Sequence, residues 1–142
     1  MQPIYEREID RERERACAVK LQASGYITAP TVTTSKWDIT MFTGDGRMDA
    51  VVEFKWRRKR YPTLKIDKSK IDGVINVAKS FNVRPILVIQ WKDFGYFYWH
   101  CHQDSLTSPM TRTEPRGIAG EVMEAADRCY EIPVSEFEEL SC

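Results

Sequence analysis

The stretch that decides the fold is KWDITMFTGDGRMDAVVEFKW, residues 36–56. Polar and apolar residues alternate through residues 36–42, and residues 47–56 read as the return strand; such alternation is typical of a half-buried strand. Between them lies Asp45-Gly46, a dipeptide that strongly favours a tight hairpin turn. The segment therefore predicts a β-hairpin.

A two-residue turn fixes the register of this hairpin, because Gly44 then faces Arg47 and every later pair follows. Three apolar pairs come to lie on one side: Trp37 with Phe54, Ile39 with Val52, and Met41 with Ala50. Opposed side chains on one face of a hairpin pack together. This side is therefore predicted to face the core.

The other side of the hairpin is predicted to be polar, with Asp38 opposite Glu53 and Lys36 opposite Lys55. Opposed Cβ atoms lie about 4.5–5.5 Å apart, so two ionised carboxylates repel each other there. A divalent cation between them reverses that interaction, and oxygen ligands at this spacing suit Mg²⁺. A lysine beside it can orient or deprotonate the attacking water. Taken alone, however, the pattern fits an ordinary polar face of paired charges better.

The residues that follow the hairpin are strongly basic. Residues 55–70 contain a single acid, Asp67, and eight cations: Lys55, Arg57, Arg58, Lys59, Arg60, Lys65, Lys68 and Lys70. A cluster of this density favours a polyanionic partner, although a solvated surface is the alternative. We therefore predict that the phosphates of such a partner are bound, without sequence readout, by Lys36, Arg57, Arg58, Lys59, Arg60, Lys65, Lys68 and Lys70.

The rest of the chain predicts an α/β architecture in the order α-β-β-α-β-β. The remaining elements are a helix over 4–24 that Gly25 ends, a basic loop over 57–66, a helix over 68–81 that Asp67 caps and Asn82 ends, and strands over 84–91 and 96–101. Residues 102–127 are expected to be extended or partly disordered. An edge strand is expected over 129–132, and Ser135-x-x-Glu138 is a capping box for a short last helix.

The 142 residues are enough for one domain with a tail. Residues 1–101 hold 18 Lys and Arg against 12 Asp and Glu, whereas residues 102–142 hold 3 against 9. We therefore expect a core domain over 1–101 and an acidic extension over 102–142. No window approaches the roughly 20 apolar residues of a membrane span. The N-terminus lacks a signal-peptide pattern, and the four cysteines form no CxxC pair, so we expect a cytoplasmic protein without membrane contact.

Asp38, followed after fourteen residues by Glu53-Phe54-Lys55, resembles the split motif of the PD-(D/E)xK nuclease superfamily. Within it, the likeness is to the archaeal Holliday-junction resolvase branch and to small phage-encoded nucleases. Those proteins share a first helix that carries a glutamate and ends in Gly-aromatic, as Gly25-Tyr26 does here. The likeness covers about residues 4–101. This sequence has Trp37 where many members have a proline before the Asp.

The resemblance implies a restriction-endonuclease-like fold with a mixed sheet between helices. It implies that Asp38, Glu53 and the carbonyl group of Phe54 bind Mg²⁺, for which Mn²⁺ can substitute, and that Lys55 is the catalytic lysine. It further implies that Glu14 is the helical glutamate that supports the metal-bound water, although Glu12 and Asp10 stay open as alternatives. A symmetric junction needs two symmetric cuts, so the likeness also implies a homodimer.

The leading hypothesis is thus a Mg²⁺-dependent endonuclease that acts on DNA, branched DNA included. A nucleic-acid-binding module of the same fold without turnover is the second hypothesis. A protein-interaction role for the acidic extension and the aromatic residues is the third.

Overall fold

The computed structural model describes residues 8–23, 25–30, 37–101, 110–111 and 128–140. Within these residues, two helices and nine strands follow one another, with a short 3-10 helix near the end. Their bounds are α1 Glu8–Ala23, β1 Ile27–Pro30, β2 Ile39–Phe42, β3 Met48–Arg57, β4 Thr63–Asp67, α2 Lys68–Phe81, β5 Arg84–Trp91, β6 Gly95–His100, β7 Met110–Thr111, β8 Arg128–Pro133, η3 Val134–Glu136 and β9 Glu138–Glu139.

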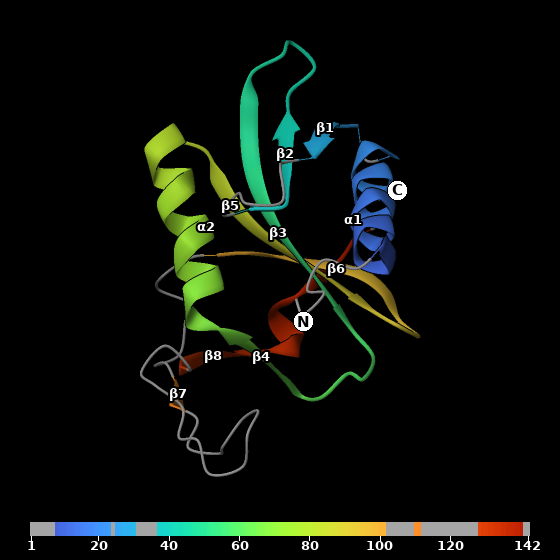
Figure 1. Cartoon of the computed structure of the whole chain (residues 1–142), viewed down its shortest axis with the longest axis vertical. Coiled ribbons are helices and arrows are strands. Elements are labelled where there is room, and N and C mark those ends of the chain that lie inside the picture. Colours follow the sequence, from blue (N-terminus) through green and yellow to red (C-terminus); the bar gives the residue numbers. More distant parts are fainter. Residues whose placement is uncertain (1–7, 24, 31–36, 102–109, 112–127, 141–142) are drawn as a thin grey trace, which may run out of the picture.

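The main sheet has six strands in the order β1-β2-β3-β5-β6-β9 (Figure 1). β3 and β5 pair in parallel, and the other neighbours in this sheet pair antiparallel. α2 is the crossover that a parallel connection requires, because it returns the chain from the end of β3 to the start of β5. A smaller sheet has the order β4-β8-β7. The predicted α/β class, with a mixed sheet flanked by helices, is confirmed.

Each face of the main sheet has its own hydrophobic core. On one face, α2, β4 and β8 cover Val51 of β3 and Leu87 and Ile89 of β5. On the other face, Cys17 and Leu21 of α1 pack over a cluster that includes Val52 and Val88. Burying one such aliphatic side chain stabilises a fold by about 1.5–3 kcal/mol. β3 and β5 therefore anchor the molecule, since both of their faces are covered.

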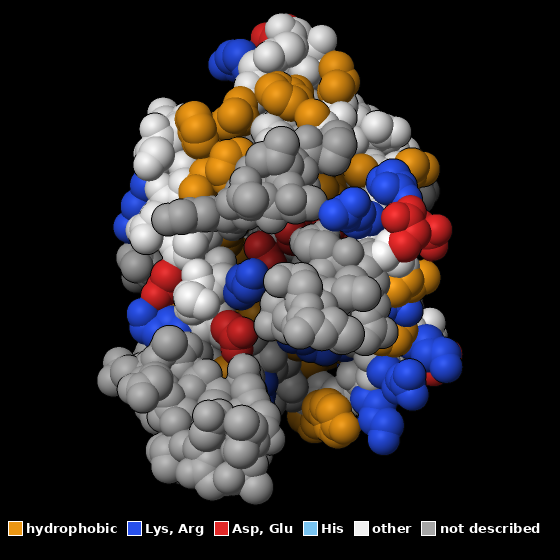
Figure 2. Space-filling model, in the orientation of Figure 1, with side chains coloured by type: hydrophobic (Ala, Val, Ile, Leu, Met, Phe, Trp, Pro, Cys, Tyr) orange, Lys and Arg blue, Asp and Glu red, His pale blue; other side chains and the backbone are white. Residues whose placement is uncertain are grey.

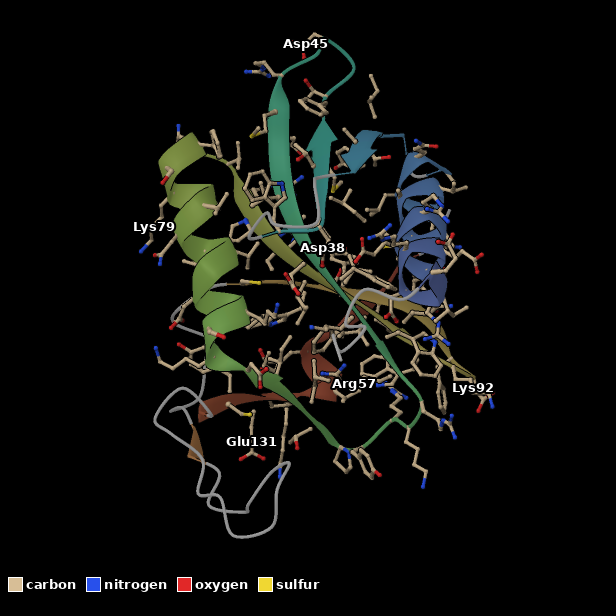
Figure 3. All side chains as sticks on the ribbon, viewed as in Figure 1. Asp38, Asp45, Arg57, Lys79, Lys92 and Glu131 are labelled. Carbon is tan, nitrogen blue, oxygen red and sulfur yellow. The ribbon has the colours of Figure 1, made fainter. Side chains whose placement is uncertain are left out.

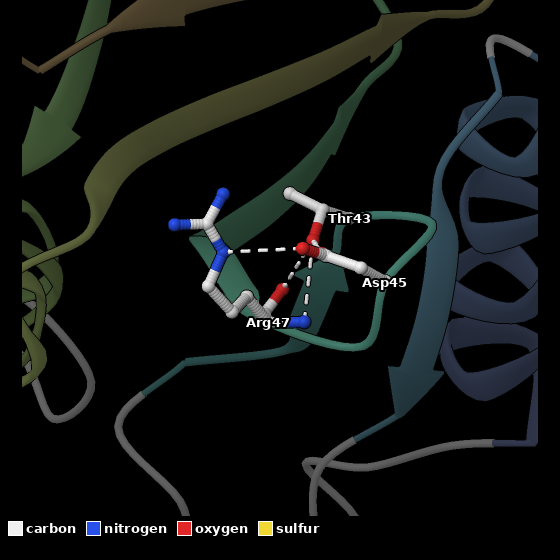
Figure 4. Close-up of polar contacts among 3 residues, drawn as sticks. All are labelled: Thr43, Asp45 and Arg47. Atoms are coloured by element: carbon white, nitrogen blue, oxygen red, sulfur yellow. Dashed lines mark hydrogen bonds and ion pairs between the residues drawn. The ribbon is translucent and has the colours of Figure 1, made fainter.

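The hairpin turn differs from the two-residue turn that the sequence predicts (Figure 4). Thr43 faces Arg47, with a hydrogen bond of 2.8 Å from its N–H to the Arg47 carbonyl, so the loop is Gly44-Asp45-Gly46. The Thr43 hydroxyl donates to Asp45, and Arg47 Nε lies 3.6 Å from Asp45 Oδ2. Gly46 has a φ of +88°, which a glycine adopts without strain.

A β-bulge then restores the register that the sequence predicts. Phe42 pairs with Met48 but Met41 pairs with Ala50, so Asp49 is the additional residue in β3. The pairs Met41 with Ala50 and Ile39 with Val52 are therefore confirmed. The longer turn and the bulge compensate each other, which is why a wrong turn prediction gave a correct register.

Trp37 departs from the predicted core face. β2 begins only at Ile39, and Trp37 lies in the bend before it. Its ring packs with the α2 side of the sheet, edge-on to Phe81, whereas Phe54 belongs to the α1 side. The predicted Trp37–Phe54 pair is wrong, because the alternation of side chains does not extend beyond the first strand residue.

Several further elements differ from expectation. The predicted basic loop contains β4, in which Leu64 and Ile66 are buried, and β1 was not expected. The capping box forms no α-helix, because η3 occupies Val134–Glu136 and β9 follows directly. Asp67 stands at the N-cap of α2 without a side-chain cap hydrogen bond, whereas Asn82 ends α2 in the left-handed conformation as predicted.

The C-terminal residues join both sheets. The predicted edge strand is confirmed as β8, which pairs with β4, and β9 pairs with β6. Residues 128–140 also supply Ile132 and Phe137 to the core on the α2 side. The boundary at residue 101 stays a prediction, and residues 102–109 and 112–127 lie outside the described residues. Neither α1 nor α2 is long and apolar enough to cross a membrane.

Candidate active site

The site lies at the part of β3 that extends beyond its pairing with β2. The pairing of β2 with β3 ends at Ile39 and Val52. Within the described strands, residues 53–57 of β3 therefore pair only with β5. Asp38 occupies the open edge, beside β3 in Figure 3. Its N–H donates to the Val52 carbonyl at 2.8 Å, and its Oδ2 accepts from the Phe54 N–H at 2.8 Å. Asp38 is thus fixed against β3 by two hydrogen bonds.

The carbonyl group of Phe54 faces the same edge as Asp38. The N–H and C=O groups of one strand residue point to the same side of the strand. Since the Phe54 N–H donates to Asp38, its carbonyl oxygen is directed to the open edge as well. A backbone oxygen and a carboxylate are therefore adjacent there.

Glu53 is buried although it is ionisable, with only 4% of its surface exposed. Burial raises its pKa, and the neighbouring carboxylate of Asp38 raises it further, with a smaller contribution from Glu14. Lys55, whose Nζ lies 3.7 Å from Glu53 Oε2, and Lys70 act in the opposite direction. The net result is a pKa of about 8, so Glu53 is mostly protonated at neutral pH unless a cation joins it.

These residues line one cavity of about 280 Å³, which we call the carboxylate cavity. β3 contributes Glu53 through Arg57, and Asp38 comes from the bend before β2. From α1 come Asp10, Arg13 and Glu14, and α2 contributes Lys70. The structure therefore brings together Asp38, Glu53, Phe54, Lys55, Glu14, Arg57 and Lys70, all of which the sequence proposed.

The donor set of this cavity fits Mg²⁺. Two carboxylates and a backbone carbonyl are hard oxygen donors, and Mg²⁺ is typically held by one or two carboxylates while it keeps several waters. Within the described residues, no group of three or more His, Cys, Asp or Glu side chains is placed to hold a metal ion. Glu53, Asp38 and Phe54 all line the carboxylate cavity.

Sequence reasoning missed Arg13 and Trp56. The Arg13 guanidinium lies 3.8 Å from the centroid of the Trp56 ring, and Arg13 Nη1 lies 3.9 Å from Asp10 Oδ1. A cation held over an aromatic ring in this way is oriented as well as stabilised. The spacing of Asp10, Arg13 and Glu14, at i, i+3 and i+4, puts them on one helix face and could have revealed the set.

The remaining predicted DNA contacts lie elsewhere. Arg58, Lys59 and Lys65 line a second cavity of about 680 Å³, which we call the basic cavity. Arg57 lines both cavities, so they adjoin. Figure 2 shows Lys and Arg side chains gathered at the lower right of this view.

Two of the predicted contacts, both among the described residues, line neither cavity. The Arg60 guanidinium lies 5.1 Å from the Phe94 ring centroid and 5.4 Å from that of Trp91. Lys68 pairs with Asp72 and lies 6.0 Å from the ring centroid of Tyr130. Lys36 lies outside the described residues.

Comparison with known proteins identifies the family. The family model described as "Phage putative PDDEXK endonuclease" matches residues 1–140. Among solved structures, the fold is similar to that of Archaeoglobus fulgidus Hjc, a Holliday junction resolvase from an archaeal hyperthermophile. The TM-score is 0.61 at 16% sequence identity, over 88% of this chain and 84% of that one. No curated protein matches the sequence. With the family model matching nearly its whole length, the chain belongs to this phage PDDEXK endonuclease family.

Proposed function

We propose that the protein is a Mg²⁺-dependent endonuclease that hydrolyses DNA phosphodiester bonds in the carboxylate cavity. The observation that carries the proposal is the burial of Glu53 beside Asp38, with Lys55 and Lys70 around them. Two neighbouring carboxylates in a buried place are unfavourable until a divalent cation neutralises them. An arrangement that is costly without a ligand supports a binding role rather than a structural one.

The chain's own residues would divide the chemistry among them. Asp38, Glu53 and the Phe54 carbonyl would hold the cation, and Mg²⁺ when bound polarises phosphoryl oxygens and neutralises negative charge. Lys55 Nζ lies 3.7 Å from Glu53 Oε2, where it can orient the attacking water. Arg13, Arg57 and Lys70 place positive charge around the cavity for the scissile phosphate. Glu14 is proposed to hold the water by a hydrogen bond.

Water would attack phosphorus in line as the bond from phosphorus to the leaving sugar oxygen breaks, and that oxygen takes a proton from solvent to become a hydroxyl group. The proton that water loses passes to solvent. We propose that the products carry a 5′-phosphate and a 3′-hydroxyl. The substrate is proposed to include branched DNA and the active form a homodimer, in keeping with the resolvase fold. Three buried cysteines among the described residues form no disulfide, which suits action in the reducing cytoplasm.

A cleavage assay tests the proposal. Labelled four-way junction, flap and plain duplex DNAs are incubated with the protein in Mg²⁺ and in excess chelator, and the ends of any product are determined. We expect cleavage in Mg²⁺ alone. Glu53→Gln should abolish cleavage and leave DNA binding intact. The control variant Glu139→Gln makes the same change on the exposed strand β9 and should behave as wild type.

Two outcomes would contradict the proposal. Full cleavage by Glu53→Gln, or by the wild type in chelator, would remove this mechanism. DNA binding that is sensitive to salt but never followed by cleavage of any DNA or RNA would instead favour the non-catalytic binding module.

A further inference from the structure

The basic cavity has a composition that a row of duplex phosphates does not require. Arg57, Arg58, Lys59 and Lys65 line it together with Tyr61 and Trp91. No acidic side chain among the described residues lines it, and no acid in the described part of the chain pairs with Arg58 or Lys59. The cavity thus combines positive charge with aromatic surface.

The size of the basic cavity selects the class of ligand. At about 680 Å³ it falls within the roughly 300–1,000 Å³ that small-molecule pockets occupy. A base-paired duplex is too wide to enter such a space, and its phosphates would contact only the rim. A single unpaired nucleotide fits the cavity, because its flat base suits the aromatic surface and its charged phosphate suits the cations.

Tyr61 is the residue placed to stack on a base. Its side chain is 61% exposed, while Trp91 is 1% exposed and forms the wall. Every base has a π-face, so stacking on an exposed ring tolerates any sequence. Beside the cavity, Arg60 lies over the rings of Trp91, Phe94 and Phe97 and adds positive charge to the same region.

Arg57 ties this cavity to the proposed site of cleavage. Its side chain lines both cavities, and its guanidinium donates to the Trp56 carbonyl at 3.1 Å. A nucleotide in the basic cavity would therefore belong to the strand that passes the carboxylate cavity, a short distance along its backbone.

We propose that the basic cavity holds an unpaired nucleotide of the DNA substrate, with its base on Tyr61 and its phosphate on Arg58 and Lys59. This inference rests on the proposed nuclease function and narrows its substrate to DNA with a single-stranded segment next to the scissile bond. Continuous duplex DNA is then a poorer ligand.

Binding to a tailed duplex tests the inference. The Glu53→Gln protein is used because it leaves the DNA intact. Its affinity is measured for a blunt duplex and for the same duplex with a short thymidine tail at the 5′ end or at the 3′ end. We expect one tail polarity to improve the affinity about tenfold. Tyr61→Ala should remove that gain and Tyr61→Phe should keep it, while the affinity for the blunt duplex stays unchanged in both.

Arg58→Ala provides a second arm, with Lys79→Ala on the exposed face of α2 as the matched control. Arg58→Ala should weaken tailed DNA more than blunt DNA, and Lys79→Ala should affect neither. Equal affinity for tailed and blunt DNA in the parent protein, or equal weakening of both by Tyr61→Ala, would overturn the inference. Circular dichroism confirms that each variant is folded.

The two proposals fail separately. Cleavage of DNA without any effect of the tail would overturn the nucleotide pocket alone. A tail effect that depends on Tyr61, in a wild-type protein that cleaves nothing, would overturn the nuclease mechanism and keep the pocket.

Discussion

The carboxylate cavity and the basic cavity share Arg57, yet the first contains a buried acid and the second is lined by exposed cations. In the first, an acid with 4% of its surface exposed lies against a second acid, and its pKa rises to about 8. In the second, the cations are exposed to solvent, so they stay hydrated and carry no desolvation penalty. Buried charge of this kind is unfavourable for folding, whereas exposed charge is not. The difference supports the proposal that the first cavity performs the chemistry and the second binds DNA.

The largest expected effect is a difference in cleavage rate between variants of Lys55, in the carboxylate cavity, and Lys59, in the basic cavity. Lys55→Ala should lower the cleavage rate at saturating DNA by about 10²–10⁴, because the amine is placed to act on the attacking water. Lys59→Ala should leave that rate unchanged and weaken DNA binding a few-fold. Single-turnover cleavage with excess protein measures the rate apart from affinity. A Lys55→Ala protein with a wild-type rate would contradict the division.

Glu53 should also make stability depend on pH. Its pKa is about 8 in the folded protein and about 4.5 when unfolded, so the folded state binds the proton more tightly. Without divalent cations, the free energy of unfolding should therefore fall as pH rises from about 4.5 to 8, by on the order of a few kcal/mol. Glu53→Gln should flatten this dependence and be the more stable protein at pH 8.

Urea denaturation at several pH values in chelator measures this dependence. Added Mg²⁺ should restore stability to the wild type at pH 8 and have no such effect on Glu53→Gln, because metal binding displaces the proton. Equal pH dependence in the two proteins would show that Glu53 is not the buried acid responsible.

A smaller effect is expected from exposed cations. Arg58→Ala should reduce the affinity for plain duplex DNA a few-fold, and the slope of log affinity against log salt should fall by about one. Titrations at several salt concentrations measure this slope. An unchanged slope would mean that Arg58 neutralises no phosphate.

The smallest effect is expected at the hairpin turn, away from both cavities. Gly46 has a φ of +88°, so Gly46→Ala should cost about 1 kcal/mol of stability. Gly44→Ala, at a glycine outside the left-handed region, should cost less. Neither change should affect cleavage at a temperature where the protein is folded, because the bulge at Asp49 fixes the register nearer the site. Loss of cleavage in Gly46→Ala alone would show that the turn sets the position of Asp38.

The hairpin and its motif were predictable because the pattern is local. The alternation through β3 and the spacing of Asp38, Glu53 and Lys55 are visible in the sequence, and so are the ends of α2. The burial of Glu53 was not predictable, since it depends on elements distant in sequence that cover β3 on both faces. The same holds for Arg13 over Trp56, a contact between α1 and β3.

The basic segment shows why charge alone misleads. Residues 57–66 look like a loop because of their cations and Pro62, yet β4 forms where Leu64 and Ile66 can be buried against α2 and β8. Tertiary packing there overrides a weak local pattern. Likewise, the capping box at Ser135 forms no helix, because Val134 and Phe137 are buried in the core and β9 pairs with β6.

Binding of Mn²⁺ measured by titration calorimetry tests the central claim most directly, namely that Asp38 and Glu53 share one divalent cation. At pH 8 we expect the wild type to bind Mn²⁺, and both Asp38→Asn and Glu53→Gln to lose at least about tenfold in affinity. Glu139→Gln should bind as the wild type does. Equal Mn²⁺ affinity in all four proteins would contradict the account.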